Sequence, residues 1–239
     1  MAHYRSIVIL TGAGVSAESG VQTFRGPDGL WEGHRVEDVA TPEAFARDPD
    51  LVQTFYNMRR AALKTAAPNP AHTALARLEA QFSGDVLLVT QNVDDLHERG
   101  GSKNLLHMHG ALKKVRCTVC GARFEWEDDL TQATQCPSCG ASPALRPDIV
   151  WFGEMPHGMR TIEDALARCD LFISIGTSGN VYPAAGFVSM ARHYGQAHTL
   201  EINLEPSLGA SQFHECRHGP AGTLVPAFVD EVLEATGSP

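Results

Sequence analysis

Six cysteines occur in this chain of 239 residues, and four of them have the spacing of metal ligands. These four form two Cys-x2-Cys pairs with 15 residues between the pairs: Cys117, Cys120, Cys136 and Cys139. The spacing is typical of a zinc ribbon, in which four thiolates hold one tetrahedral Zn2+ and leave no position for water or substrate. The sequence therefore predicts one structural zinc site, with two reduced pairs and no metal as the alternative. We expect Cys169 and Cys216 to be small buried or partly buried residues.

A glycine-rich motif at residues 12–17 has the form Gly-x-Gly-x-x-Ala and directly follows an apolar run at 7–10. Such glycines let the backbone approach a pyrophosphate at the start of a helix, so the motif predicts dinucleotide binding. The acidic residue that usually follows about 20 residues later is missing, which disfavours an ordinary hydride-transfer enzyme. The alternative is a glycine turn that only packs a helix against a strand.

Three other side chains could contribute chemistry. His109 lies just before the cysteine segment, where two domains are expected to meet, and clefts form at such junctions. A neutral imidazole there could act as a general base near pH 7, or it could be a histidine with structural hydrogen bonds only. Tyr56 and Arg59 are three residues apart, so a helix would place both on one face. They could bind a carboxylate together, or lie on a solvated helix face.

The elements that must position these residues follow from the hydrophobic pattern. Short apolar runs that end in polar residues or glycine predict four buried strands, at 7–10, 86–89, 171–175 and 198–202. Helical patterns separate them, at 71–82, 160–168 and 184–194. This alternation predicts an α/β fold with a Rossmann-like parallel sheet that has helices on both faces. Ligands bind such sheets at the carboxyl ends of the strands, so the four polar strand ends should meet at one site.

Two stretches interrupt the alternation, and we expect them to form a smaller helical and zinc-binding domain, made of 25–68 and 111–147. The larger, Rossmann-like domain, which carries the dinucleotide-binding motif, then comprises 1–24, 69–110 and 148–239. A final helical pattern at 225–235, with Pro226 near its start, predicts a packing helix with no chemistry of its own.

Composition limits the possible functions. With 43% hydrophobic and 20% charged residues the chain is of ordinary globular type, and its length suggests between one and two domains. The formal net charge of −9 and the lack of a basic run argue against binding nucleic acid. No apolar stretch approaches the roughly 18 residues that a membrane span needs, and the first residues do not resemble a secretory signal. The expected location is therefore the cytoplasm, with no membrane contact.

Taken together, seven features in this order resemble the sirtuin family of NAD-dependent protein-lysine deacylases: TGAGVSAESGVQTFRG, TQNVDDLHERGG, HMHG, the four cysteines, RPDIVWFGE, GTS and INLE. The resemblance runs from about residue 7 to residue 232. It implies NAD as a consumed co-substrate, one structural Zn2+ and an acyl-lysine peptide in the cleft between the domains. The implied reaction cleaves NAD, releases nicotinamide and O-acyl-ADP-ribose, and uses His109 as the general base.

The resemblance also implies a set of cofactor-binding residues. Around the diphosphate and its ribose these are Gly12, Ala13, Gly14, Ser16, Ala17, Glu18, Ser19, Thr23, Phe24, Arg25 and Trp31. Near the nicotinamide and its ribose they are Gln91, Asn92, Val93 and Asp94. On the adenosine side they are Gly176, Thr177, Ser178, Asn203, Leu204, Glu205 and Ala221. The absence of an acidic residue after the glycine motif is then expected, because this family contacts the adenosine ribose from a later strand end, here residues 203–205.

The segment ATPEAFARDPDLVQTFYNMRR further resembles the class III sirtuins, which remove acidic acyl groups. Tyr56 with Arg59 matches their acid-recognition pair, and Ala40 matches a small residue that leaves room for a longer acyl chain. The implied substrates are succinyl- and malonyl-lysine, with acetyl-lysine also accepted. The peptide should pair as an added strand, with substrate contacts at Val150, Phe152, Gly153 and Val181. The sequence GNVYPA departs from the commoner leucine-bearing version of that loop.

Two other functions remain possible from the sequence. The same site could transfer ADP-ribose to a protein. Alternatively, the zinc ribbon could be a binding module on an inert sheet domain, although the acidic net charge and the polar strand ends do not favour this.

Overall fold

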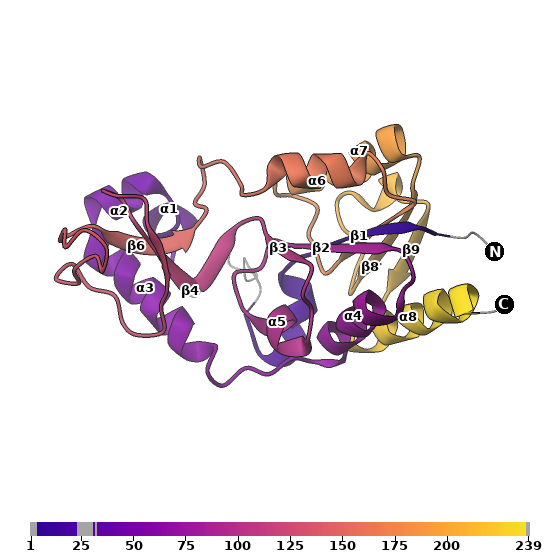
Figure 1. The fold of residues 1–239 in the computed structure, drawn as a ribbon, viewed down its shortest axis with the longest axis horizontal. Coiled ribbons are helices and arrows are strands. Elements are labelled where there is room, and N and C mark those ends of the chain that lie inside the picture. Colours follow the sequence, from indigo (N-terminus) through magenta and orange to yellow (C-terminus); the bar gives the residue numbers. More distant parts are fainter. Residues whose placement is uncertain (1–3, 23–30, 32, 238–239) are drawn as a thin grey trace.

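The structure, a computed structural model, describes residues 4–22, 31 and 33–237. It has two parts (Figure 1). The larger part contains a six-stranded sheet, and the smaller part, on the left in Figure 1, contains the helix α3 (Pro49–Ala62) and the strands β4 (Gly110–Cys117) and β6 (Leu145–Ile149). No helix in the described ranges is long and apolar enough to cross a membrane.

The larger sheet is parallel throughout, with the strand order β3-β2-β1-β7-β8-β9. Its strands, in chain order, are β1 (Ser6–Thr11), β2 (Asp85–Thr90), β3 (Leu105–His107), β7 (Leu171–Ile175), β8 (His198–Asn203) and β9 (Glu215–His218). The central strands are almost continuously buried, and all five residues of β7 are buried. Such runs are typical of strands that are covered on both faces.

Helices cover both faces of this sheet (Figure 1). On one face lie α4 (Pro70–Gln81) and α8 (Ala221–Gly237), and on the other lie α6 (Met159–Leu166) and α7 (Phe187–Met190). Alternate residues of β1 supply the two cores: Ile7 and Ile9 face α4 and α8, whereas Val8 and Leu10 face α6 and α7. The predicted fold class, a helix-covered parallel sheet, is confirmed.

The predicted elements differ from the observed ones mainly at their ends. The four predicted strands extend by no more than two residues, but β3 and β9 were not predicted. The single helix predicted at 184–194 is three short pieces, η2 (Ala184–Gly186), α7 and a π-helical turn, η3 (Ala191–Gly195). The last helix begins at Ala221 rather than at residue 225, so Pro226 lies in its second turn.

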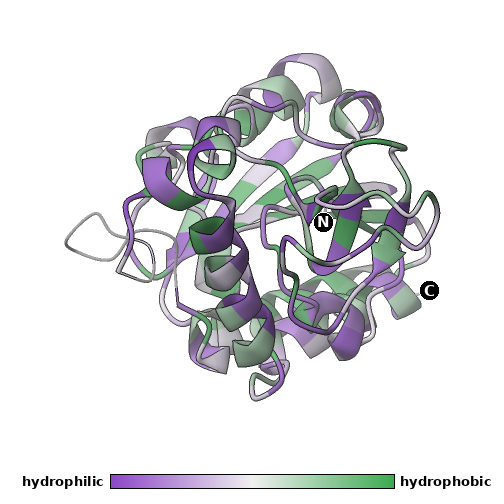
Figure 2. Cartoon of the chain, turned by 90° about the vertical axis from the view of Figure 1, so that its left-hand side faces the viewer, coloured by the Kyte–Doolittle hydropathy of each residue, from purple (hydrophilic) through white to green (hydrophobic). Residues whose placement is uncertain are grey.

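The smaller part joins helices to a three-stranded antiparallel sheet, in the order β5-β4-β6 with β5 at Arg123–Glu125. Its helices are α1 (Val36–Val39), α2 (Pro42–Arg47) and α3. The starts of α2 and α3 follow from their sequence, because each has proline at its first position and a capping side chain before it. The Thr41 hydroxyl accepts from the Ala44 amide at 3.0 Å, and the Asp48 carboxylate accepts from the Leu51 amide at 3.0 Å. Figure 2 looks onto this part and shows hydrophilic and hydrophobic stretches alternating along its helices.

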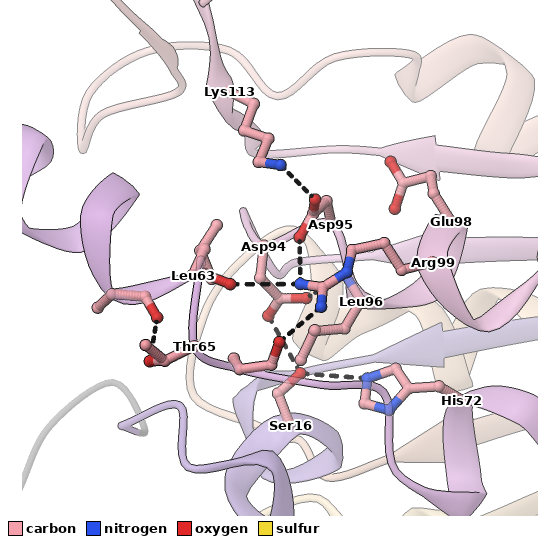
Figure 3. A network of polar contacts seen from close by, with 12 residues as sticks. Ser16, Leu63, Thr65, His72, Asp94, Asp95, Leu96, Glu98, Arg99 and Lys113 are labelled. Carbon is pink, nitrogen blue, oxygen red and sulfur yellow. Dashed lines mark hydrogen bonds and ion pairs between the residues drawn. The ribbon is translucent and has the colours of Figure 1, made fainter. Parts of the chain in front are cut away.

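Side chains at the helix α5 (Leu96–Gly100), which lies between β2 and β3 of the large sheet, contact the smaller part. Figure 3 shows these contacts from close by. Arg99 donates hydrogen bonds to the carbonyls of Leu63, at 3.3 Å, and Ala66, at 2.6 Å, just after α3. The Lys113 ammonium on β4 lies 2.9 Å from the carboxylate of Asp95. These contacts hold the end of α3 and the strand β4 against the large sheet, and so fix the walls of the space between the two parts.

Candidate active site

A cavity of about 790 Å3 lies between the two parts of the molecule. Four strand ends contribute to its wall: Gly12 follows β1, Gln91 follows β2, Gly176 follows β7, and Asn203 ends β8. The carboxyl ends of parallel strands are where open α/β sheets bind ligands. The four polar strand ends predicted to meet at one site therefore do meet there.

The glycine motif after β1 packs against the end of β7 with no room for side chains. The Gly14 amide donates to the Gly176 carbonyl at 2.9 Å, and a Cβ on Gly14 would lie 2.7 Å from the Gly176 Cα. Gly176 itself has a φ of 62°, which favours glycine. Packing thus accounts for these glycines, and the same tight turn leads into the helical segment η1 (Ala13–Ser19), whose first residues face the cavity.

A buried hydrogen-bond network lies beneath the cavity floor, and Figure 3 shows its core. The His72 Nδ1 accepts from the Asn69 amide at 3.2 Å, so in the neutral ring Nε2 carries the proton and donates to the Ser16 hydroxyl at 3.3 Å. The Asn92 side chain also donates to this hydroxyl, at 3.1 Å, and the hydroxyl donates to the Asp94 carboxylate at 3.1 Å. The orientations of Asn92 and Asp94, which both line the cavity, are therefore fixed from behind.

Burial determines the charge states in this network. It lowers the pKa of His72 to about 4, so that the ring is neutral. Burial also raises the pKa of Asp94, opposed by the hydrogen bonds that the carboxylate accepts from the Leu96 amide and from Ser16. A neutral histidine, a serine and a carboxyl group therefore form a defined chain of donors and acceptors.

His109 lies on the cavity wall between the two parts, at the residue before β4. Its Nδ1 is 3.2 Å from the Gln91 carbonyl oxygen. A carbonyl can only accept, so Nδ1 carries the proton and Nε2 has a free lone pair in the neutral ring. Burial lowers the pKa of His109, and the nearby His157 lowers it further, although the bond to Gln91 opposes both. At neutral pH this imidazole is an uncharged acceptor.

Tyr56 and Arg59 both reach the cavity from α3, so the prediction that they share a helix face is confirmed. The Tyr56 side chain is fully buried, and its hydroxyl accepts a hydrogen bond from the Trp151 indole at 2.9 Å. Burial raises the pKa of Tyr56 to about 12, so the phenol keeps its proton as a donor. The Arg59 guanidinium lies 4.1 Å above the ring of Trp31, which orients the charge. The alternative of a solvated helix face is wrong for this pair.

The four predicted zinc ligands come together in the smaller part. All four Sγ atoms lie within 4.8 Å of one another. The Sγ separation is 3.8 Å for Cys117 and Cys139 and 3.7 Å for Cys120 and Cys136. Four thiolates around one Zn2+ would be roughly 3.8 Å apart, given Zn–S bonds of about 2.3 Å. The donor set therefore fits the predicted zinc ion. Of the other two cysteines, Cys169 is buried as expected, whereas Cys216 is exposed.

Most of the other predicted residues also line the cavity. From the predicted cofactor site these are Gly12, Ala13, Gly14, Ala17, Glu18, Trp31, Gln91, Asn92, Val93, Asp94, Gly176, Thr177, Ser178, Asn203, Leu204 and Ala221. From the predicted substrate site they are Ala40, Tyr56, Arg59, Val150, Phe152, Gly153 and Val181. Ser16, Ser19 and Glu205 are not on the wall, and Ser16 acts from behind it. Thr23, Phe24 and Arg25 lie outside the described residues.

Sequence reasoning missed several residues of this site. Trp151 and His72 orient Tyr56 and Ser16, but their partners are 95 and 56 positions away in the chain, so no spacing could reveal them. Gln22, Tyr182 and Pro220 also line the cavity. Pro220 follows the unpredicted strand β9, and recognition of that strand would have placed a fifth strand end at the site.

The fold and the cavity define a two-part protein with a nucleotide-type cleft, in which a parallel sheet faces a smaller helical and four-cysteine unit. Residues 12–183 match the family model described as Sir2 family, and the chain belongs to that family. This confirms the family that the sequence motifs resemble.

Similar proteins agree with this assignment. The chain is 60% identical over 233 residues to a protein of Bdellovibrio bacteriovorus named NAD-dependent protein deacylase, covering 97% of this chain and 98% of that one. It is also 60% identical over 232 residues to a Vibrio parahaemolyticus protein of the same name, covering 96% of each. Among solved structures, a Sir2 homolog–NAD complex matches with a TM-score of 0.88 at 42% identity, covering 98% of this chain and 91% of that one. A Sir2 mutant with p53 peptide and NAD matches with a TM-score of 0.79 at 29% identity, covering 98% and 94%.

Proposed function

We propose that this protein is an NAD-dependent protein-lysine deacylase that removes succinyl and malonyl groups and also accepts acetyl-lysine. The names of its relatives support the general activity and NAD as the cofactor. The observation that carries the acyl preference is the position of Tyr56 and Arg59 on the wall of the same cavity that His109 reaches. A phenol and a guanidinium are thereby available to an acyl chain that extends from the reacting carbonyl.

The cavity suits a dinucleotide. Its volume of about 790 Å3 lies within the range of small-molecule sites, and its floor is built from glycine turns and polar strand ends. When bound, NAD supplies the ADP-ribosyl group that receives the acyl group, and nicotinamide leaves. Asn92 and Asp94, held from behind by Ser16, would orient the nicotinamide end.

His109 has the properties of a general base. Its Nδ1 proton is engaged by the Gln91 carbonyl, so Nε2 is left to remove a proton from a ribose hydroxyl. Burial keeps the ring neutral near pH 7, which is the form that accepts a proton. The position of His109 directly before β4 ties this base to the smaller part of the molecule.

Arg59 and Tyr56 would hold the free carboxylate of an acidic acyl group. The guanidinium supplies charge-assisted hydrogen bonds, and the phenol of Tyr56 can donate its proton because its oxygen already accepts from Trp151. Ala40 lies on the same wall, where its single methyl group leaves room for the acyl chain. An acetyl group would occupy the same channel without reaching Arg59.

The acyl-lysine peptide is expected to lie along residues 150–153, opposite Val181. The Val150 amide donates to the His109 carbonyl at 2.9 Å, and the Phe152 amide donates to the Ala40 carbonyl at 3.0 Å. This segment thus joins the catalytic histidine to the acyl pocket and then turns, since the Glu154 amide donates to the Trp151 carbonyl at 2.9 Å. We expect the peptide to pair alongside it as an added strand. A zinc ion held by the four cysteines would stabilise the sheet to which this segment is joined.

The decisive experiment incubates the protein with succinyl-, malonyl- and acetyl-lysine peptides, with and without NAD, and measures nicotinamide and deacylated peptide. Arg59→Met should lower kcat/KM for the acidic peptides by about 10- to 100-fold, the loss expected for hydrogen bonds between charged groups, and should leave acetyl-lysine turnover within about threefold. Arg47→Met is the matched control, because Arg47 is an exposed arginine on α2 away from the cavity.

Two outcomes would overturn the proposed activity, and a third would overturn the proposed acyl preference. If no peptide is deacylated in an NAD-dependent manner, the activity is wrong. If nicotinamide is released while ADP-ribose becomes attached to protein, the alternative of an ADP-ribosyltransferase on the same site is correct. Equal losses on acetyl and succinyl peptides in Arg59→Met would exclude a carboxylate-binding role for Arg59 alone.

A further inference from the structure

A carboxylate, a thiol and an imidazole gather at the edge of the large sheet, apart from the cysteine cluster. Glu201 on β8 is paired in register with Cys216 on β9, and His218 lies two residues further along β9. Alternate residues of a strand point to the same face, and paired residues of parallel strands share a face, so all three side chains project from one side. One ligand atom from each lies within 4.8 Å of the other two.

The carboxylate in this group is buried and held in place. Glu201 is only 1% exposed, and its two oxygens accept hydrogen bonds from the hydroxyl and the backbone amide of Ser207. Its ion-pair partner in the described part of the chain is His218, whose Nε2 lies 3.7 Å from Oε2. A buried carboxylate is costly unless it is paired, and a bound cation would neutralise it.

From this arrangement we propose that Glu201, Cys216 and His218 form a second metal site, which takes Zn2+ or a similar borderline transition-metal ion. Nitrogen, sulfur and oxygen donors together suit zinc, whereas Mg2+ and Ca2+ prefer oxygen ligands only. Tetrahedral ligands on zinc are roughly 3.3 to 3.6 Å apart for bonds of about 2.0 to 2.3 Å. The 3.7 Å between His218 and Glu201 needs almost no adjustment to meet this requirement.

The surroundings also resemble those of a metal site. Ser207 hydrogen-bonds the carboxylate from behind, as partners outside the coordination shell orient metal-binding carboxylates. Cys216 and His218 are at the surface, so an ion can enter from solvent. Three protein ligands leave a fourth position open to water, in contrast to the closed set of four thiolates.

The site is close to the wall of the active-site cavity without being part of it. His218 is paired with Asn203 and followed by Gly219, and both Asn203 and Gly219 line the cavity. The Gly219 amide donates to the Asn203 carbonyl at 2.9 Å. A bound ion would therefore fasten the edge strand β9 to β8 beside the adenosine end of the cleft.

The test measures zinc bound per chain by mass spectrometry of the metal, after equilibrium dialysis of the reduced full-length protein against buffered Zn2+. The wild type should hold about two ions, one at the four cysteines and one at the proposed site. Cys216→Ser and His218→Ala should each hold about one. His193→Ala should hold about two, because His193 is an exposed histidine outside both clusters.

Substitution of two surface ligands, rather than of the buried Glu201, keeps the fold intact, and circular dichroism checks this for each variant. Co2+ gives a second readout, because tetrahedral coordination with one thiolate adds absorption bands to the wild type that both variants should lack. A stoichiometry of about one in the wild type, or equal stoichiometry in the wild type and in both variants, would overturn the proposal. Neither result depends on deacylase activity.

Discussion

At the scale of single residues, His109 is set up as a base by what surrounds it rather than by its own chemistry. Burial and His157 lower its pKa, and the base works in the neutral form. Activity should therefore fall as the pH drops through a pKa below the usual value of about 6.5. His157→Gln removes the second cause and should raise that apparent pKa. The measurement is kcat/KM against pH with saturating NAD. An acidic limb that stays in place in His157→Gln would contradict this account.

Sequence reasoning reached His109 because it precedes the cysteine segment, and it paired Tyr56 with Arg59 because helical spacing puts them on one face. It could not show that Tyr56 is fully buried against Trp151, since that contact joins α3 to the end of β6 across 95 positions. Spacing along the chain shows only which residues are neighbours on the same helix or strand. The electrostatic environment of a side chain depends on elements that only the folded structure brings together.

At the scale of elements, the start of α4 is coupled to the cavity floor. Asn69 caps this helix by accepting from the Ala71 amide at 2.9 Å, and His72 completes the capping box while it donates to Ser16. Burial lowers the pKa of His72 to about 4. Between pH 6.5 and pH 4 the unfolded chain binds a proton at this residue that the folded chain does not. This difference lowers the free energy of unfolding by about 3 kcal/mol as the pH falls across that range.

Substitution of the ring tests this coupling. His72→Gln cannot titrate, so its free energy of unfolding should depend on pH less steeply than that of the wild type, by about one proton between pH 6.5 and pH 4. Urea denaturation at several pH values measures the slope. Burial also lowers the pKa of His97, which is unchanged in this variant. The contribution of His97 to the pH dependence of the free energy of unfolding should therefore be the same in both proteins. Equal slopes in the two proteins would show that His72 is charged in the folded state.

Elements with a strong hydrophobic signal were predicted well, and those without one were missed. The strands β1, β2, β7 and β8 are buried runs, and prediction placed their ends within two residues. By contrast, β9 is an edge strand with the sequence Glu-Cys-Arg-His, and β3 has three half-buried residues. Such edge strands form because the neighbouring strand offers hydrogen-bond partners to their backbone. Their own side chains carry no pattern that would indicate a strand.

At the scale of the whole molecule, the active site depends on two parts that are stabilised in different ways. The large sheet has two extensive cores, one on each face. In the smaller part, one core packs the helices α1, α2 and α3 against Leu112 of β4 and Ile149 of β6. The separate core around the cysteines contains only six buried residues, Val115, Cys117, Leu130, Cys136, Ala144 and Leu145. Two of the six are predicted metal ligands themselves. A core this small needs the metal to be stable, whereas the large sheet does not.

Removal of zinc should therefore unfold the cysteine-bearing sheet of the smaller part and spare the large sheet. With a chelator strong enough to empty the four-cysteine site, amide hydrogen exchange should become fast across β4, β5 and β6 and stay slow in β1, β7 and β8. Deacylation should be lost with it, because β4 follows His109 and β6 leads into residues 150–153. Cys216→Ser is the control, since its four-cysteine site is intact and its exchange in β4, β5 and β6 should match the wild type before chelation. Slow exchange in β4 and β6 after complete zinc removal would show that packing alone holds the smaller part together.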